Sequence, residues 1–249
     1  MKVLDGKVAV VTGAGQNIGR AIARDLARAG AVVVVNGRQN QDLIDTVVDE
    51  IETFGGRALG VMADVSDPSA VSEMIDEAAR RFGGIDILVS NAGLRRQTSF
   101  LDMDFDEWRE ILSVALDGAF LLARAVVPQM IDRGGGAIVA LSGISPHVGT
   151  PNRCHVLASK AGLEGFIRAL AVELAPRHIT CNCVAPGAID TVRGESAGGT
   201  PSNIKERQIP LGRKGTVKEI AAMVRFLVGP EGGYVTGQTI HVNGGAFLT

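Results

Sequence analysis

The stretch KVAVVTGAGQNIG, residues 7–19, contains the pattern that decides the fold of this 249-residue chain. Its first half is apolar and β-branched, as in a buried strand, and a glycine-rich turn then leads into an amphipathic helix expected over residues 18–29. The glycines are Gly13, Gly15 and Gly19. Small residues let the backbone approach a pyrophosphate, and a helix N-terminus presents free N–H groups to it. The strand–turn–helix unit therefore predicts a dinucleotide site.

The same alternation of apolar strands and amphipathic helices continues to the end of the chain. Further strands are expected at residues 31–37, 58–64, 85–93, 136–142, 179–187 and 238–245, and further helices at 41–54, 68–82, 105–131 and 153–175. Apolar strands joined through helices form a parallel sheet that is covered on both faces. We therefore predict one α/β domain over residues 1–249, a Rossmann-type doubly wound parallel sheet of about seven strands with helices on both faces.

Composition excludes several classes of protein. Apolar residues make up 46% of the chain and the formal net charge is −2, so neither a disordered chain nor a nucleic-acid or membrane-surface partner is indicated. No apolar run approaches the roughly 18 residues that span a bilayer, and the N-terminus has no signal-peptide core, so we expect a cytoplasmic protein. Cys181 and Cys183 lie on one face of an expected strand without a second ligand pair, which predicts no metal site.

Motifs along the whole chain resemble those of the short-chain dehydrogenase/reductase family, particularly its 3-oxoacyl-acyl-carrier-protein-reductase-like members. Residues 12–19 match the cofactor turn of that family, although Asn17 stands at a glycine position. Asparagine tolerates left-handed backbone, and its amide could reach a phosphate. The resemblance implies that the cofactor site also contains Ile18, Asp64, Val65, Asn91, Ala92, Gly93, Pro186, Gly187 and Ile189.

The end of the second expected strand bears on the type of cofactor. Members of this family that bind NAD usually carry an acid there, whereas this chain has Asn36, Gly37 and Arg38. Without a carboxylate, nothing repels a 2′-phosphate, and the guanidinium of Arg38 can pair with one. We therefore favour NADP(H) over NAD(H), with Asn36 and Arg38 at the cofactor; alternatively, Arg38 is only a solvated loop residue.

The resemblance also implies four catalytic positions, of which three hold other residues. The lysine that holds the nicotinamide ribose is Lys160, but the proton-donating tyrosine position is Val156. The serine position is Gly143, and the asparagine position is Ala115. A positioned general acid contributes roughly a hundred- to ten-thousandfold in rate, and valine cannot exchange a proton. The ordinary mechanism of the family is therefore excluded, although hydride transfer with another proton source is not.

Several residues near these positions are candidate replacements. We take Ser142 and His155 as candidates beside Lys160, with Ser145 and His147 also close in the sequence. Three arginines are expected at the cleft and favour an anionic substrate such as a carboxylate; they are Arg95, Arg96 and Arg153. The alternative is that these arginines are loop charges and that His155 packs against a neighbour.

Three hypotheses about function stay open. The first is an NADP(H)-dependent oxidoreductase with an unusual proton source. The second is a lyase, isomerase or hydrolase in the same pocket, and the third is a non-catalytic dinucleotide-binding protein. Residues 192–215 are rich in glycine, serine, proline and charge and predict a substrate lid. The resemblance further implies a homotetramer that pairs the helices at 105–131 and 153–175.

Overall fold

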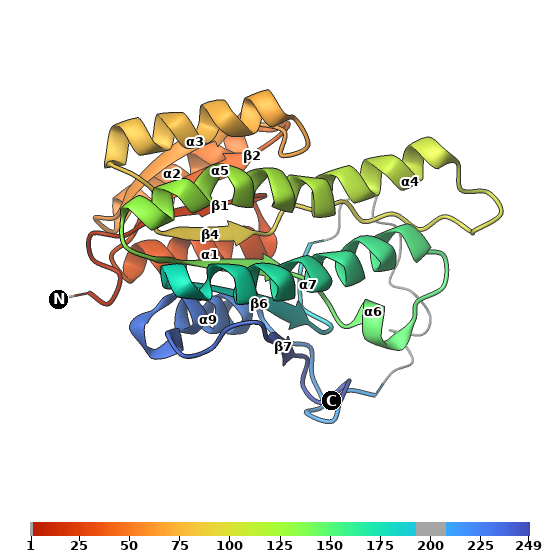
Figure 1. Cartoon of the computed structure of the whole chain (residues 1–249). Coiled ribbons are helices and arrows are strands. Elements are labelled where there is room, and N and C mark those ends of the chain that lie inside the picture. Colours follow the sequence, from red (N-terminus) through yellow and green to blue (C-terminus); the bar gives the residue numbers. More distant parts are fainter. Residues whose placement is uncertain (1, 193–207) are drawn as a thin grey trace.

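The computed structural model describes residues 2–192 and 208–249. Its centre is a seven-stranded sheet of order β3-β2-β1-β4-β5-β6-β7, in which every pairing is parallel (Figure 1). The strands are β1 (Val8–Val11), β2 (Val32–Gly37), β3 (Arg57–Met62), β4 (Ile87–Ser90), β5 (Gly136–Leu141), β6 (Ile179–Pro186) and β7 (Thr239–Val242). The strand order reverses between β1 and β4, which opens a crevice at the carboxyl ends. The predicted fold class is confirmed.

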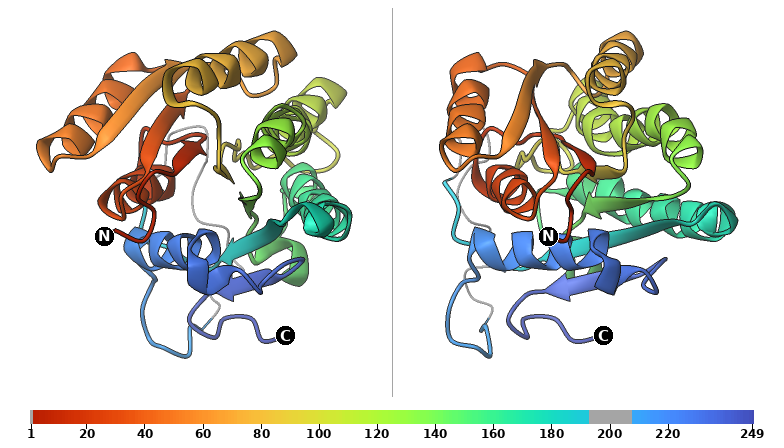
Figure 2. Two further views of the ribbon diagram at one scale, coloured as in Figure 1. Left: turned by 60° about the vertical axis from the view of Figure 1, so that its left-hand side comes forward. Right: turned by 90° about the vertical axis from the view of Figure 1, so that its left-hand side faces the viewer.

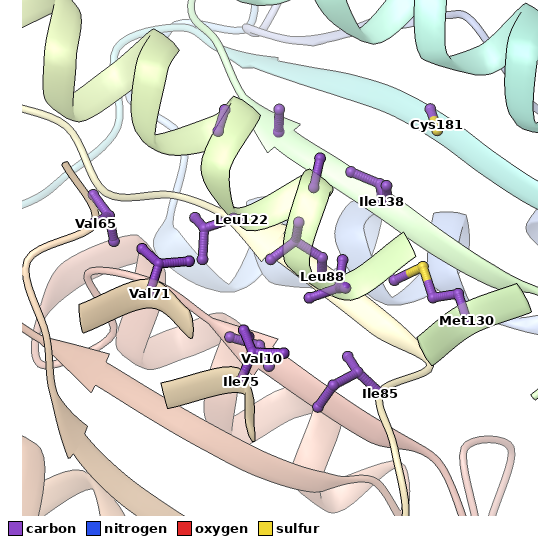
Figure 3. Packing of buried hydrophobic residues seen from close by; sticks show 14 of the residues in the cluster. Val10, Val65, Val71, Ile75, Ile85, Leu88, Leu122, Met130, Ile138 and Cys181 are labelled. Atoms are coloured by element: carbon purple, nitrogen blue, oxygen red, sulfur yellow. The ribbon is translucent and has the colours of Figure 1, made fainter. Parts of the chain in front are cut away.

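Helices cover both faces of the sheet (Figure 2). One face carries α1 (Asn17–Arg28), α2 (Gln41–Thr53) and α9 (Val217–Val228), and the other carries α3 (Pro68–Phe82), α5 (Gly118–Asp132) and α7 (Cys154–Leu174). The short helix α6 (Ser145–Val148) lies between β5 and α7. Each face has its own buried cluster; Figure 3 shows Val10, Leu88 and Ile138 of the strands against Ile75, Leu122 and Met130 of the helices.

The helix expected over residues 105–131 is interrupted. It consists of α4 (Phe105–Leu112), a π-helical segment η1 (Ser113–Asp117) and α5. Asp104 caps α4 by accepting a hydrogen bond from Glu107 N at 2.7 Å. The Glu107 carboxylate itself accepts a hydrogen bond from Thr98 Oγ1 at 2.6 Å and contacts His155.

By length and apolar content, the helix Phe105–Asp132 is the one helix in the described ranges that could cross a membrane. Its inner face is fully buried against the sheet, since Leu122 and Met130 have no exposed surface. The helix therefore belongs to the core of the domain. Cys181 and Cys183 are likewise buried together in the α3–α5–α7 core, and burial raises the pKa of each thiol to about 12.

Candidate functional site

The turn between β1 and α1 is built for close backbone approach. Gly13 has a φ of +59°, and a Cβ on Gly19 would lie 2.3 Å from the Gly13 carbonyl oxygen, so neither position accepts another residue without strain. The Asn91 amide donates to the carbonyl oxygens of Thr12 and Gly13 at 2.8 and 3.0 Å. The Thr12 hydroxyl in turn accepts hydrogen bonds from the backbone of Asn91 and Ala92. The end of β4 thus fixes the turn.

The N-terminus of α1 has no side-chain cap and no acidic residue in its first turn. In contrast, α2, α3, α4 and α9 are each capped by a side chain, namely Asn40, Asp67, Asp104 and Thr216. The first N–H groups of a helix need an acceptor, and an anion is a favourable one. The residues present therefore fit the pyrophosphate of a dinucleotide at this point.

Asn17 adopts the left-handed backbone that its sequence position predicted, with a φ of +51°. Its side chain is used differently from the expectation. The amide donates to Val192 O and accepts from Val192 N, each at 2.9 Å, so it joins the glycine turn to the chain after β6. Both ends of the amide thus pair with main chain, and the suggestion that it also reaches a phosphate stays a prediction.

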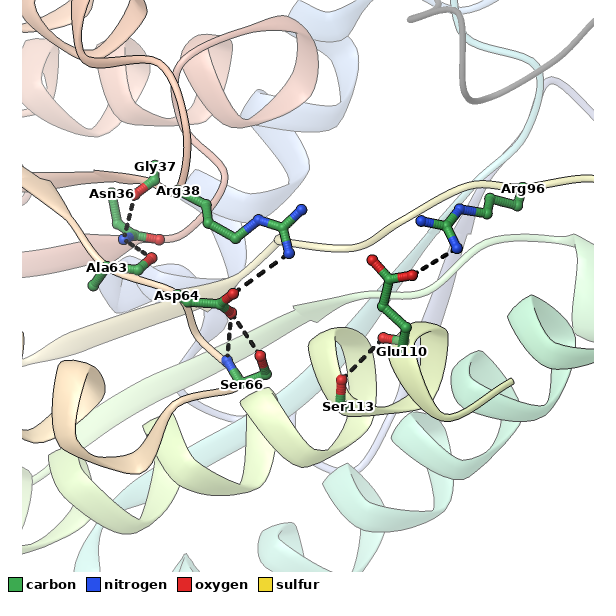
Figure 4. Close-up of polar contacts among 9 residues, drawn as sticks. All are labelled: Asn36, Gly37, Arg38, Ala63, Asp64, Ser66, Arg96, Glu110 and Ser113. Carbon is green, nitrogen blue, oxygen red and sulfur yellow. Dashed lines mark hydrogen bonds and ion pairs between the residues drawn. The ribbon is translucent and has the colours of Figure 1, made fainter. Parts of the chain in front are cut away.

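At the end of β2, Asn36 and Arg38 have different surroundings (Figure 4). Asn36 is buried and its amide donates to the carbonyl oxygen of Ala63 at 3.0 Å, so it links β2 to the end of β3 and does not face the crevice. Arg38 is part-exposed and its Nη1 lies 3.4 Å from Asp64 Oδ2. Asp64 also accepts two hydrogen bonds from Ser66. Partial burial acts to raise the pKa of Asp64. The hydrogen bonds from Ser66 and the positive charge of Arg38 outweigh it and hold this pKa below its ordinary value.

Beyond the turn, a cavity of about 210 Å³ lies at the carboxyl ends of β4, β5 and β6. Of the residues expected at the cofactor, those that line this cavity are Ile18, Asn91, Gly93, Pro186, Gly187 and Ile189. Val65 is not among the lining residues; its side chain is buried against Gly118 of α5. Arg95 and Arg153 also line the cavity, whereas Arg96 is paired with Glu110 of α4 at 2.6 Å (Figure 4). Two of the three expected arginines are therefore at the cleft.

Lys160 extends from α7 into this cavity. Its Nζ donates to the carbonyl oxygen of Leu141 at the end of β5, at 2.5 Å. Burial, and next the positive charge of Arg95, lower the pKa of Lys160 to about 8. The lysine is thus held between α7 and β5, close to the glycine turn.

The comparisons with known proteins agree with this geometry. The sequence pattern of the family described as enoyl-(acyl carrier protein) reductase matches residues 13–246. The chain belongs to the short-chain dehydrogenase/reductase family. It is 39% identical over 249 residues to a 3-oxoacyl-[acyl-carrier-protein] reductase of Synechocystis sp., with all of both chains covered. It is 40% identical over 245 residues to the reductase of that name from Staphylococcus aureus, covering 97% of this chain and 98% of the relative.

Solved structures include a close neighbour. A crystal structure of a protein described as a short-chain alcohol dehydrogenase, from Sinorhizobium meliloti, superposes with a TM-score of 0.91 at 38% identity, covering 98% of this chain and 97% of that one. Proteins of the short-chain dehydrogenase/reductase family are oxidoreductases, and membership implies a nicotinamide dinucleotide as cofactor.

The residues at the tyrosine, serine and asparagine positions of the family differ in where they lie relative to the cavity. Val156 lies one turn before Lys160 and lines the cavity. Gly143 lines it too, and a Cβ there would have no heavy atom nearer than Pro186 O at 3.9 Å, so the space is open. Ala115 is buried in the π-helical segment η1 and is not among the lining residues. The only tyrosine of the chain, Tyr234, is fully exposed and does not line this cavity either.

Of the candidate replacements, the structure brings Ser142 to the cavity but not His155. His155 is fully buried, and its Nε2 lies 2.9 Å from Glu107 Oε1 of α4. The expectation that His155 acts beside Lys160 is therefore wrong in this geometry. Adjacent residues of a helix point about 100° apart, and this rotation turns His155 toward α4 while Val156 faces the cavity. His155 instead links α4 to α7.

Ser142 has a partner that sequence reasoning missed. Its hydroxyl donates to Glu164 Oε1 of α7 at 2.5 Å, and His147 Nε2 lies 3.0 Å from the same oxygen. Glu164 is only 3% exposed. The signal was present in the sequence, because Glu164 follows Val156 and Lys160 at intervals of four residues and so shares their helix face.

Proposed function

We propose that this chain is an NADP(H)-dependent oxidoreductase that reduces a carbonyl group and takes its proton from a group other than tyrosine. The observation that carries the proposal is Lys160, held in the cavity beside an intact glycine turn while Val156 and Gly143 occupy the same wall. The glycine turn, the uncapped N-terminus of α1 and Lys160 support nucleotide binding, whereas Val156 cannot donate a proton.

The proposal assigns a role to each end of the site. The uncapped N-terminus of α1 would bind the pyrophosphate, Lys160 the nicotinamide ribose, and Arg38 the 2′-phosphate. When bound, the reduced nucleotide supplies the hydride. Asp64 is close enough to Arg38 to compete for it, so 2′-phosphate binding requires the guanidinium to exchange one anionic partner for another. NADP(H) is favoured because the crevice end of β2 carries no carboxylate of its own.

The substrate in this proposal is a 3-oxo compound with negative charge. The curated relatives named above are 3-oxoacyl-[acyl-carrier-protein] reductases, which supports the carbonyl class. Arg95 and Arg153 on the cavity wall support an anionic group next to it. We also propose a cytoplasmic location for this reaction, which is what the sequence led us to expect.

Two further parts of the expectation stay proposals. The lid at 192–215 falls largely on residues 193–207, which lie outside the described residues; of its described part, Lys214 lines the cavity. The homotetramer is supported by apolar side chains at the surface, including Phe120 of α5, 52% exposed, and Val172 of α7, 81% exposed. Apolar groups of this kind on neighbouring helices are suited to an isologous contact with a second copy.

A non-catalytic dinucleotide-binding protein is the second candidate, and Val156 is the observation that favours it. Two measurements separate the candidates. NADPH at a hundred times its dissociation constant should stabilise the chain by about 2.7 kcal/mol in either case. Loss of nicotinamide absorbance with 3-oxoacyl thioesters and 3-oxo acids is expected only for the reductase. Product formation without nucleotide oxidation would indicate a non-redox enzyme, and no thermal shift with NADPH or NADH would refute both candidates.

A further inference from the structure

Three polar side chains from three different elements meet beside the cavity. Ser142 follows β5, His147 belongs to α6, and Glu164 belongs to α7. Glu164 Oε1 accepts the hydrogen bond from Ser142 Oγ and lies 3.0 Å from His147 Nε2, so one carboxylate oxygen connects the other two groups. Ser142 lines the cavity, Glu164 is buried, and the His147 side chain is 24% exposed. The three groups thus form a continuous polar path from the cavity to solvent.

We propose that this path is the proton source of the reaction, with Ser142 as the group that touches the substrate oxygen and Glu164 as the positioning residue that replaces the proton of Ser142. His147 connects Glu164 with solvent. The inference rests on the proposed reductase function. It names the groups that would donate the proton that Val156 cannot supply. It adds Glu164 and His147 to the site, and it gives Ser142 a role that depends on both of them.

The proton steps balance. The Ser142 O–H bond breaks as an O–H bond forms at the substrate oxygen, whose carbon has received the hydride and its electron pair from the reduced nicotinamide dinucleotide. The Glu164 carboxylate then takes a proton from the protonated imidazole of His147 and passes one to Ser142 Oγ, so that Glu164 gains one proton and loses one. The imidazole of His147 regains its proton from water. One proton from solvent is consumed for each carbonyl group reduced, and all three side chains return to their starting state.

The arrangement favours proton exchange over nucleophilic catalysis by Ser142. In a nucleophilic serine site, the group next to the hydroxyl is an imidazole that a carboxylate orients. Here the order is reversed, because the carboxylate touches the hydroxyl and the imidazole lies behind the carboxylate. A carboxyl group in contact with an alcohol is a suitable acid–base partner for it. A hydrolase mechanism through Ser142 is therefore the weaker interpretation.

The surroundings of Glu164 keep the path ordered. Glu164 Oε2 lies 3.6 Å from Arg168 Nη2, which leaves Oε1 for Ser142 and His147. The His147 ring lies 4.7 Å from that of His241 and 5.2 Å from that of Phe247, measured between centroids, so the C-terminal segment packs against it. The titratable and charged groups that face Glu164 are His147 on α6, Lys160 and Arg168 on α7, Cys183 on β6 and His241 on β7.

The first test compares Glu164→Gln with Glu173→Gln, since Glu173 is an exposed glutamate of the same helix. Glutamine keeps the shape of Glu164 and its hydrogen bonds but cannot exchange a proton. Glu164→Gln should lower kcat for carbonyl reduction about a hundredfold while leaving the dissociation constant for NADPH unchanged. It should also remove a pH dependence of kcat that Glu173→Gln retains. Partial recovery is expected with Glu164→Asp.

The second test needs no nucleotide. Infrared difference spectra between two pH values detect the carbonyl band of a protonated carboxyl group, and the band missing in Glu164→Gln identifies Glu164. If the groups share a proton, the pH at which this band appears should shift in His147→Gln and in Ser142→Ala. The band of Glu173 should stay where it is in both variants.

The outcomes separate the inference from the function on which it rests. An active unmutated chain with a Glu164→Gln variant of equal kcat and pH profile would overturn the inference alone. So would a Glu164 infrared band that neither partner variant moves. If Ser142→Ala and Glu164→Gln both kept full activity while Lys160→Met lost it, the path would be refuted. An unmutated chain that oxidises no reduced nucleotide would refute the proposed function, and the catalytic role of Glu164 with it.

Discussion

The side chain of Asn17 in the glycine turn makes two hydrogen bonds, each 2.9 Å long, with the backbone of Val192 beyond β6. Glycine is usual at this position in the family, and a left-handed φ of +51° explains why. Asparagine satisfies the same backbone requirement and adds a tie between two segments 175 residues apart. The departure from the family motif therefore has a structural consequence at the rim of the cofactor site.

Substitutions at Asn17 should separate these two effects. Asn17→Gly removes the tie and keeps the backbone, whereas Asn17→Ala removes the tie and adds about 1–2 kcal/mol of left-handed strain. Asn152 is the matched control, because it has a φ of +60° and no side-chain hydrogen bond to the described chain. In urea unfolding, Asn17→Gly should lose about 1 kcal/mol, and Asn152→Gly none. Equal values at both sites would show that the tie contributes nothing.

Arg38 should decide between the two nicotinamide nucleotides. A hydrogen bond to a charged group contributes about 1.5–3 kcal/mol, so Arg38→Leu should weaken NADPH binding about tenfold or more and leave NADH binding unchanged. Arg57→Leu removes the same charge at the opposite end of the sheet, where β3 begins, and should affect neither nucleotide. Titration calorimetry with both nucleotides measures the ratio of the dissociation constants for NADPH and NADH. An unchanged ratio in Arg38→Leu would show that Asp64 keeps the guanidinium and that the 2′-phosphate is not recognised there.

The fold could be predicted from the sequence because each strand and helix has a strong local pattern. Strand and helix order followed from apolar β-branched runs such as VAVV in β1 and VVVVNG in β2, and these runs pack in the only way that buries both of their faces. The π-helical segment at 113–117 could not be predicted, because its residues continue the apolar pattern of the helix on either side. Its presence depends on packing and not on local preference.

The placement of a site residue could be predicted where it depends on the position of that residue in its strand or helix. It could not be predicted where it depends on the rotation of the side chain or on a partner far away in the sequence. Lys160 reaches the cavity at the position that the family pattern indicates, and Ser142 reaches it from the residue before the serine position of the family. Asn36 has the right position, but its amide satisfies a buried carbonyl of the neighbouring strand. His155 is one residue away from the helix face that borders the cavity. Its side chain points toward α4 instead, where it contacts Glu107, 48 positions away in the sequence. Pairings of this kind are fixed only by tertiary packing.

The lowered pKa of Lys160 predicts a stability that rises with pH. In the unfolded chain the lysine keeps its proton up to about pH 10.5, whereas the folded chain releases it near pH 8, where its pKa lies. Between these values the unfolded state binds more protons, so the free energy of unfolding increases with pH, by about 1.4 kcal/mol per unit at most. Below pH 8 both states hold the proton and the charge remains an unfavourable buried one.

Two cysteines oppose this trend and require a difference measurement. The pKa values of Cys181 and Cys183 are raised to about 12 by burial, so their thiols ionise first in the unfolded chain and stability falls above about pH 9. Lys160→Met retains both cysteines. The unfolding free energy of the unmutated chain minus that of Lys160→Met should therefore rise by about 2 kcal/mol from pH 7.5 to 9.5. A difference that is flat with pH would mean that Lys160 stays charged in the fold.

Introducing the tyrosine and serine of the family at positions 156 and 143 should raise the rate of carbonyl reduction. A side chain at position 143 has room, because its Cβ would have no neighbour closer than 3.9 Å, and position 156 faces the cavity one turn before Lys160. Val156→Tyr with Gly143→Ser should increase kcat with NADPH about a hundredfold over a low baseline, the contribution of one positioned general acid. Gly143→Ser alone should give little, since serine binds the substrate oxygen without an acid behind it.

The effect of this double variant on kcat should depend on whether Glu164 is present. If Ser142 supplies the proton in the unmutated chain, then Glu164→Gln should reduce kcat far less in the Val156→Tyr, Gly143→Ser background, because the tyrosine offers a second source. Stopped-flow absorbance of the four combinations measures this non-additivity directly. A double variant that binds NADPH and gains no activity would show that the cavity no longer accepts the substrates of its relatives. An equal loss on removing Glu164 in both backgrounds would show that Glu164 supports the cavity without donating protons.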